Sequence, residues 1–292
     1  MDQASPSARL RLENQVAVVT GGTRGIGEGI VRRFVEEGAS VVFSGRSDER
    51  AKALEEELGK YVAFYRADAA NASETEALMK FAVERFGRLD CVVNNAGRGS
   101  ERGPIAGASV EGFNQTIVLY LGGTFLGIKY AVPQLQNGGT IINIASIAGL
   151  VGGYGAHAYT AAKFGVIGLT KSVALELAER RIRVNAICVG AVATAIFAPV
   201  AAAAGEITPD ILERSPDIVA PWLAEDVPLG RSGFPIDVAN AALWLASSES
   251  SFVTGEALTV DGGILAGRSW TQMLSRYDQL RERFRSALRP EL

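Results

Sequence analysis

A glycine-rich turn between an apolar segment and an amphipathic segment places the strongest limit on the fold. Residues 16–20 read VAVVT, the pattern of a buried strand, and residues 29–39 read GIVRRFVEEGA, the pattern of a helix. The turn between them carries Gly21, Gly25 and Gly27. Glycine permits backbone conformations and close approaches that a side chain would block, and the amide groups at a helix start attract phosphate. The arrangement predicts a pyrophosphate site, the alternative being a tight turn with no ligand.

Strand-like and helix-like segments alternate along most of the chain. Such alternation builds parallel strands joined by helical crossovers. We therefore predict an α/β fold, in which one Rossmann-type, doubly wound parallel sheet of about seven strands carries helices on both faces within a single domain. The expected strands are 16–20, 40–45, 61–68, 89–97, 140–146, 182–190 and 257–263, and the expected helices are 29–39, 49–58, 74–86, 110–131, 159–178 and 236–247.

The end of the second strand indicates which nucleotide the turn would bind. In dinucleotide folds an acidic residue at this position accepts hydrogen bonds from the adenosine ribose. This chain has Gly45 and Arg46 there instead. An arginine suits a 2′-phosphate by its charge and its paired hydrogen bonds, and Arg24 adds a second positive charge. We expect NADP(H), with NAD(H) as the alternative cofactor; otherwise Arg46 is a solvated residue at a strand end.

Polar residues also follow the third and fourth strands. Asp68 either accepts a hydrogen bond from the adenine amino group or helps to cap the next helix through Asn71 and Ser73. Residues 94–97 read NNAG, and such small and amide side chains suit close packing against a cofactor beyond the sheet edge. The alternative for this second segment is an ordinary turn.

A second set of residues is suited to proton transfer. Tyr159 and Lys163 are four residues apart, which places them one turn apart on one helix face. A lysine ammonium would favour ionisation of the phenol and lower its pKa, so that the tyrosine exchanges a proton with a substrate hydroxyl. Ser146, at the end of an apolar run, is placed to hydrogen-bond the same oxygen.

Composition excludes several other classes of protein. The 29 basic and 32 acidic residues give a formal net charge of −3, which argues against a nucleic-acid binder. No apolar run is long enough to cross a membrane, and the polar N-terminus has no signal core. Cys91 and Cys188 lie in apolar runs and are expected to be buried and reduced. We therefore expect a cytoplasmic protein, and no metal site.

Three segments lie outside the predicted sheet and its helices. Residues 1–13 are expected to form a flexible tail, and residues 193–228, rich in alanine and proline, a mobile or short-helical cover over the substrate. Residues 266–292 are expected to form a helical extension. Its apolar residues need a partner, for which a subunit contact in a homotetramer or homodimer, or a cover over a neighbouring site, is favoured over a membrane. They are Trp270, Met273, Leu274, Tyr277, Phe284 and Leu288.

Five segments in this order resemble the short-chain dehydrogenase/reductase family. They are TGGTRGIG, the Ala-Asp pair at 67–68, NNAG, the set of Ser146, Tyr159 and Lys163, and the run PLGRSG…DVANAALWLAS…VTGEALTVDGG. The resemblance covers roughly residues 14–263, and we predict a Rossmann-fold domain over residues 14–265. The resemblance implies that Tyr159 is the acid and base, Lys163 its partner, and Ser146 the residue that positions the substrate oxygen. It further implies a cofactor site of Gly21, Thr23, Arg24, Gly25, Ile26, Gly27, Arg46, Asp68, Ala69, Asn95, Ala96, Gly97, Tyr159, Lys163, Gly190, Val192 and Thr194.

The chain departs from the family pattern at two places. An asparagine that holds a water for proton relay is replaced by Tyr120, whose larger phenol is expected to displace that water. The usual Pro-Gly after the sixth strand is Val189-Gly190. We keep Tyr120 as a fourth catalytic candidate.

The resemblance predicts an NAD(P)-dependent oxidoreductase that interconverts a secondary alcohol and a ketone. The apolar cover favours a bulky apolar or alicyclic substrate, with Ser146, His157 and Phe197 as substrate-contact candidates. For His157 the alternative is a loop residue that packs over the site. The alternative functions are a reductase of 3-oxoacyl thioesters and, because of Tyr120, a catalytically weak cofactor-binding homologue.

Overall fold

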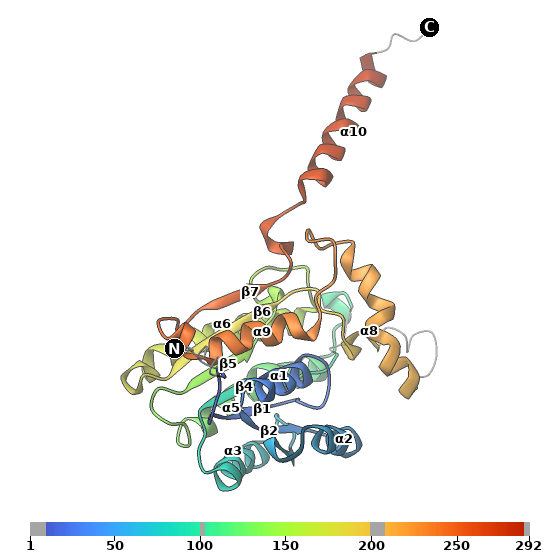
Figure 1. The fold of residues 1–292 in the computed structure, drawn as a ribbon. Helices are drawn as coiled ribbons and strands as arrows, with labels where there is room; N and C mark the ends of the chain where they lie inside the picture. Colours follow the sequence, from blue (N-terminus) through green and yellow to red (C-terminus); the bar gives the residue numbers. More distant parts are fainter. Residues whose placement is uncertain (1–9, 100–102, 199–207, 289–292) are drawn as a thin grey trace, which may run out of the picture.

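The computed structural model describes residues 10–99, 103–198 and 208–288. Within them the strands form one seven-stranded sheet in the order β3-β2-β1-β4-β5-β6-β7, and every neighbouring pair runs parallel. This is the predicted doubly wound α/β fold in a single domain (Figure 1). The strands are β1 (Val16–Val19), β2 (Ser40–Gly45), β3 (Val62–Arg66), β4 (Cys91–Asn94), β5 (Thr140–Ile144), β6 (Arg183–Val189) and β7 (Ala257–Val260).

Helices cover both faces of the sheet because successive strand residues point to opposite sides. In β1, Val19 packs in a core cluster with α1 and α9, whereas Val18 packs in a second cluster with α3, α5 and α6. Both residues are fully buried. The helices are α1 (Gly25–Glu36), α2 (Asp48–Leu58), α3 (Ala72–Phe86), α4 (Val110–Ile117), α5 (Gly123–Ala131), α6 (His157–Leu177), α8 (Pro209–Ala224), α9 (Pro235–Ala246) and α10 (Trp270–Leu288).

The predicted helix over residues 110–131 contains a break in its hydrogen-bond pattern. A π-helical segment, Val118–Gly122, separates α4 from α5, and the buried Tyr120 lies in it. π-Helical turns are rare and frequently occur at functional sites.

The predicted cover is more regular than its composition indicates. The short-helical form expected for residues 193–228 is wrong for its second half, where α8 runs for 16 residues with Pro216 and Pro221 inside it. Proline removes the hydrogen bond to the carbonyl four residues earlier. For Pro216 that carbonyl belongs to Leu212, and it accepts the Ser215 hydroxyl at 3.1 Å instead. Residues 199–207 of the predicted cover lie outside the described residues.

The two chain ends differ in how they meet the body. Leu12, within the segment expected to be a tail, is only 1% exposed and packs in the core, and the Leu12 amide donates to the Glu37 carbonyl at 2.9 Å. Residues 1–9 of that segment lie outside the described residues. At the other end α10 stands clear of the body (Figure 1) and has no buried residue. None of the described helices combines the length and the apolar character that crossing a membrane would require.

Candidate active site

One cavity of about 970 Å³ lies at the edge of the sheet where the parallel strands end. The loops after β1 to β6 and the start of α6 contribute to its wall. His157 does not line this cavity, and it is exposed at the first position of α6. Gly27 is not in the wall either, because it packs behind the turn. The predicted residues that do line it are Gly21, Thr23, Arg24, Gly25, Ile26, Arg46, Asp68, Ala69, Asn95, Ala96, Gly97, Tyr120, Ser146, Tyr159, Lys163, Gly190, Val192, Thr194 and Phe197.

The glycine turn is shaped as a phosphate site requires. Gly21 and Gly25 have φ values of 67° and 55°, which favour glycine. A Cβ on Gly27 would lie 2.2 Å from the carbonyl oxygen of Gly21. The Asn95 side chain holds the turn, since its Nδ2 donates to the carbonyls of Thr20 at 2.9 Å and Gly21 at 3.1 Å. The amide therefore supports the turn from behind.

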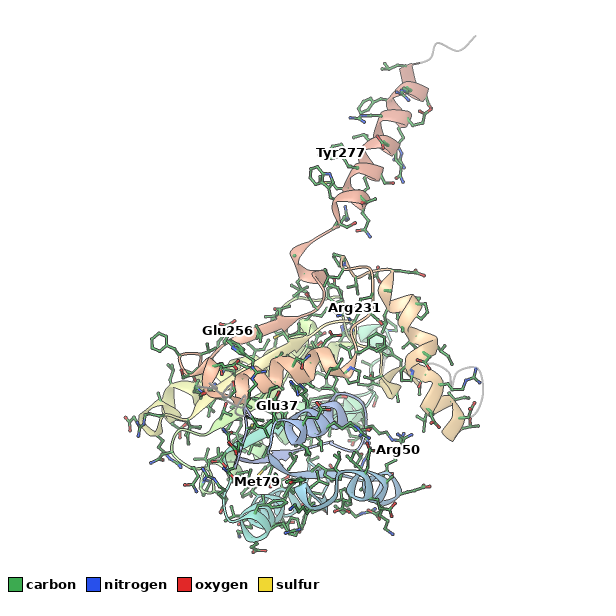
Figure 2. The ribbon with its side chains drawn as sticks, viewed as in Figure 1. Glu37, Arg50, Met79, Arg231, Glu256 and Tyr277 are labelled. Atoms are coloured by element: carbon green, nitrogen blue, oxygen red, sulfur yellow. The ribbon has the colours of Figure 1, made fainter. Side chains whose placement is uncertain are left out.

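The first turn of α1 faces the cavity with its amide groups. Arg24 occupies the N-cap position in an extended conformation and makes no side-chain capping bond. Burial, followed by the charge of Arg50, lowers the pKa of the Arg24 guanidinium. Arg50 lies in the first turn of α2 (Figure 2). A helix start next to several positive charges fits the phosphate groups of a dinucleotide.

Asp68 and the helix that follows it have separate partners. One oxygen of Asp68 accepts from the Ala70 amide at 2.9 Å. Asn71 caps α3 by accepting from the Ser73 and Glu74 amides at 3.0 Å and 3.2 Å. Asn71, and not Asp68, therefore caps α3. The Asp68 side chain borders the cavity.

The proton-transfer set meets in the wall of the same cavity. The Lys163 Nζ donates to the Ile144 carbonyl at 2.6 Å and lies 5.6 Å from the centroid of the Tyr159 ring. The Ser146 hydroxyl accepts from the Ala148 amide at 3.1 Å and donates to the Val189 carbonyl at 3.4 Å. Strand β5 delivers Ser146, and α6 delivers the other two side chains on one face.

The pKa shifts differ from the sequence-based expectation. Burial raises the pKa of the Tyr159 phenol, and a hydrogen bond with Ser146 acts in the opposite direction. Burial also lowers the pKa of Lys163 to about 7. The expected lowering of the phenol pKa by a lysine ammonium is thus not what the structure gives, because loss of solvent outweighs charge for both groups.

Tyr120 is held by the loop after β4. Its hydroxyl accepts from the Arg98 amide at 3.1 Å and donates to the carbonyl of the same residue. Its ring contacts two residues of the proton-transfer set: its centroid lies 5.0 Å from that of Tyr159 and 4.7 Å from the Lys163 Nζ. Burial raises the pKa of the Tyr120 phenol. The tyrosine therefore occupies the predicted position, with its hydroxyl bound to backbone.

Sequence reasoning missed several groups of this site. The Ile144 carbonyl that binds Lys163 is a backbone atom, and no residue type indicates it. The sequence could have indicated Arg50, because it is a third arginine near the end of the second strand. Tyr154 also lines the cavity and was not predicted, whereas Ile196 and Leu212, which line it too, belong to the apolar cover that the sequence indicates. Among the described residues, no group of three or more His, Cys, Asp or Glu side chains could hold a metal ion.

Comparison with known proteins agrees with this geometry. Residues 21–265 match the profile of a family described as "Enoyl-(Acyl carrier protein) reductase". The chain belongs to the short-chain dehydrogenase/reductase family. It is similar to the L-fucose dehydrogenase of Mus musculus, with 41% identity over 89% of this chain and 92% of the relative. It is also similar to the 3-alpha-(or 20-beta)-hydroxysteroid dehydrogenase of Mycobacterium tuberculosis (strain ATCC 25618 / H37Rv), with 39% identity over 88% and 92%.

A third relative broadens the range of alcohols. The 2,5-dichloro-2,5-cyclohexadiene-1,4-diol dehydrogenase LinX of Sphingobium indicum is 37% identical over 88% of this chain and 98% of its own. The short-chain dehydrogenase described here is therefore an NAD(P)-dependent enzyme that interconverts a CH–OH group and a carbonyl group.

Proposed function

We propose that this short-chain dehydrogenase uses NADP(H) to interconvert a bulky apolar or alicyclic secondary alcohol and its ketone. The observation that carries the proposal is the composition of one cavity. Its wall holds a glycine turn and two arginines, Arg24 and Arg46, together with Ser146, Tyr159 and Lys163. Nucleotide binding and proton transfer thus share one space.

Tyr159 is the proposed acid and base. In ketone reduction its hydroxyl donates a proton to the carbonyl oxygen, and in alcohol oxidation the phenolate accepts the hydroxyl proton. Ser146 hydrogen-bonds the same oxygen and fixes its position. A nicotinamide bound in the cavity would supply the hydride chemistry at the substrate carbon, while the side chains of this protein hold the substrate oxygen and move the proton.

Lys163 lies close to Tyr159 and supports this proton transfer. It is buried, and its Nζ is held by the Ile144 carbonyl within 5.6 Å of the Tyr159 ring centroid. A positive charge so close favours the phenolate. Burial brings the pKa of Lys163 to about 7, so the charge that supports Tyr159 titrates in the neutral range.

Three arginines favour NADP(H) over NAD(H). Arg24 and Arg46 line the cavity, and the charge of Arg50 lowers the pKa of Arg24. Like charges close together repel until an anion lies between them, and a 2′-phosphate supplies two negative charges. The position of Gly45, where an acidic residue would bind a ribose hydroxyl, agrees with this preference.

The cavity wall favours an apolar substrate. Tyr154, Ile196, Phe197 and Leu212 line it beside the proton-transfer set. Relatives named for hydroxysteroid and cyclohexadiene-diol substrates act on alicyclic alcohols. The relative named for L-fucose indicates a polar substrate as the alternative to an apolar one.

The 3-oxoacyl thioester alternative is less well supported. An acidic carrier protein would need a basic surface beside the cavity. Helix α8, which borders the cavity through Leu212, exposes acidic residues instead. In the helix they are Asp210, Glu213 and Asp217, and Glu225 and Asp226 follow its end.

We also propose a cytoplasmic homotetramer or homodimer with a catalytic domain over residues 14–265. The buried, unpaired thiols of Cys91 and Cys188 support a reducing compartment. The family profile spans nearly the same residues as the proposed domain.

The test is a panel of secondary alcohols and ketones assayed with NADP(H) and NAD(H). We expect turnover of alicyclic substrates with NADP(H), and a loss of about 10²- to 10⁴-fold in kcat for Tyr159→Phe. Tyr61→Phe makes the same chemical change at an exposed residue outside the cavity and should match the wild type. Full activity of Tyr159→Phe would overturn the assigned acid and base, and a strong preference for NAD(H) would overturn the role of Arg46.

A further inference from the structure

Helix α10 lacks the packing that normally stabilises a helix. It runs for 19 residues, has no buried residue, and stands clear of the body (Figure 1). In proteins most of the stability of a helix comes from tertiary packing of its apolar face. The helix also follows the region that matches the family profile, which ends at residue 265. It is therefore an addition to the fold that requires a partner of its own.

One face of α10 is apolar with a spacing typical of helix pairing. Large side chains recur at intervals of three and four residues, which form a continuous stripe. Tyr277 lies in the middle of this stripe (Figure 2) and is 55% exposed. We call this set the α10 stripe: Trp270, Met273, Leu274, Tyr277, Leu280, Phe284 and Leu288.

Positive charges border the α10 stripe. At helical spacing Arg276 and Arg283 lie along one edge of the stripe. Arg281 and Arg285 are paired with Asp278 and Glu282 of the same helix. Two copies of α10 packed antiparallel would bring Arg276 of one copy close to Arg283 of the other. Antiparallel pairing of α10 with itself is therefore unfavourable, and the partner surface should be apolar with acidic borders.

Helix α8 exposes such a surface. Ile218 and Trp222 lie one turn apart on its outer face and are 62% and 61% exposed. Acidic side chains surround them, with Asp217 beside Ile218 and Glu225 one turn beyond Trp222. The single arginine of α8, Arg214, is paired with Asp210. In charge and in apolar area, α8 complements α10.

Within one chain the two helices point away from each other. The Leu229 amide, just after α8, donates to the Gly262 carbonyl at 3.2 Å, so α10 begins close to where α8 ends. From there α10 rises away from α8 (Figure 1). It is thus placed to reach the equivalent helix of a copy that faces it.

We propose that α10 of one copy packs along α8 of a second copy, with the reciprocal contact completing a two-fold dimer. The helices are about 28 Å and about 24 Å long, so each matches the other over most of its length. A two-fold contact of this kind uses both helices of both chains. Because Leu212 of α8 lines the cavity, the partner's helix supports the wall of the substrate site.

Disulfide trapping tests which helices meet. One chain carries Tyr277→Cys and a second carries Trp222→Cys; the native Cys91 and Cys188 are buried and do not compete. Mild oxidation of the mixture should give a two-chain product that neither variant forms alone. Gln279→Cys, on the opposite face of α10, is the matched control and should not cross-link with Trp222→Cys.

Each other result of this experiment overturns the proposal. A Tyr277→Cys chain that cross-links with itself shows pairing of α10 with α10. A chain carrying both cysteines that cross-links at monomer mass shows α10 folded onto its own body. No cross-link in the mixture shows that α10 does not lie on α8.

Light scattering on the full chain gives an independent test. Leu280→Asp places a charge in the α10 stripe and should weaken dimerisation at least about tenfold, whereas Gln279→Asp should not. Arg283→Glu should also weaken it, and Asp217→Arg in the same chain should restore it. An unchanged mass for Leu280→Asp overturns the proposal, as does binding of the wild type, but not of Leu280→Asp, to vesicles of anionic phospholipid.

Discussion

The ring of Tyr120 meets the ring of Tyr159 edge-on, with 5.0 Å between the centroids and 86° between the ring planes. Its face also receives the Lys163 ammonium at 4.7 Å, a geometry that attracts a cation to an aromatic ring. The Tyr120 hydroxyl accepts a hydrogen bond from the Arg98 amide and donates one to the Arg98 carbonyl. Tyr120 thus positions the two proton-transfer residues with its ring and fixes the loop after β4 with its hydroxyl.

This arrangement predicts different results for two substitutions of Tyr120. Tyr120→Phe removes the bonds to Arg98 and leaves the ring. The free energy of unfolding should fall by about 0.5–1.5 kcal/mol because the part-buried hydrogen bonds with the backbone of Arg98 are lost. Because Ala96 and Gly97 of the same loop line the cavity, the KM for cofactor should rise more than kcat falls. Urea denaturation measures the free energy of unfolding, and steady-state kinetics measure KM and kcat.

Tyr120→Leu is the comparison that removes the ring without supplying the asparagine of the family pattern. Lys163 and Tyr159 then lose their shared aromatic neighbour, so kcat should fall further than in Tyr120→Phe, and the pH profile of kcat should shift. If Tyr120→Phe instead loses as much kcat as Tyr159→Phe, the hydroxyl takes part in proton transfer and the positioning role is wrong.

Cofactor preference depends on Arg46 in the proposed site. Arg46→Ala should raise the KM for NADP(H) about tenfold or more, since a hydrogen bond to a charged group contributes about 1.5–3 kcal/mol. The KM for NAD(H) should change little. Arg66→Ala is the control, because Arg66 lies at the end of the neighbouring strand, is paired with Asp48, and does not line the cavity. Equal effects on both cofactors would contradict the 2′-phosphate assignment.

The sheet and the placement of the candidate proton-transfer residues on one helix were predictable because they depend on local pattern. Strands buried on both faces read as continuous apolar runs, and the predicted limits of Ser40–Gly45 match β2. Asn71 and Gly87 mark the two ends of α3, as capping chemistry predicts. Tyr159 and Lys163 lie on α6 at the predicted helical spacing.

The features that could not be predicted depend on the surroundings of a residue in space. The raised pKa of Tyr159 comes from burial, which a spacing of four residues does not reveal. The π-helical turn at Tyr120 changes a hydrogen-bond register without a proline or glycine signal at that residue. Helix α8 tolerates Pro216 because Ser215 binds the freed carbonyl, a contact that only the folded helix creates.

The buried Lys163 should make stability depend on pH. Its pKa is lowered to about 7, so the unfolded chain binds one more proton than the folded chain between about pH 7 and about pH 10. The free energy of unfolding then rises with pH in this range, by at most about 1.4 kcal/mol per pH unit. Relative to wild type, Lys163→Met should lack this rise when urea denaturation is compared at about pH 7 and about pH 9. Lys171→Met removes an exposed lysine of the same helix and should keep it.

The glycine turn gives a prediction with a control inside the same protein. A Cβ at Gly27 would lie 2.2 Å from the Gly21 carbonyl and 2.5 Å from the Asn95 amide nitrogen, so Gly27→Ala must displace the turn. Cofactor affinity should fall at least about tenfold and the protein should be destabilised.

A Cβ at Gly168, in the interior of α6, would meet no atom of another element within 4 Å. Gly168→Ala should raise the free energy of unfolding by about 0.5–1 kcal/mol, because alanine favours the helix. Fluorescence titration with NADPH and urea denaturation distinguish the two variants, and wild-type cofactor affinity in Gly27→Ala would contradict the role given to the turn.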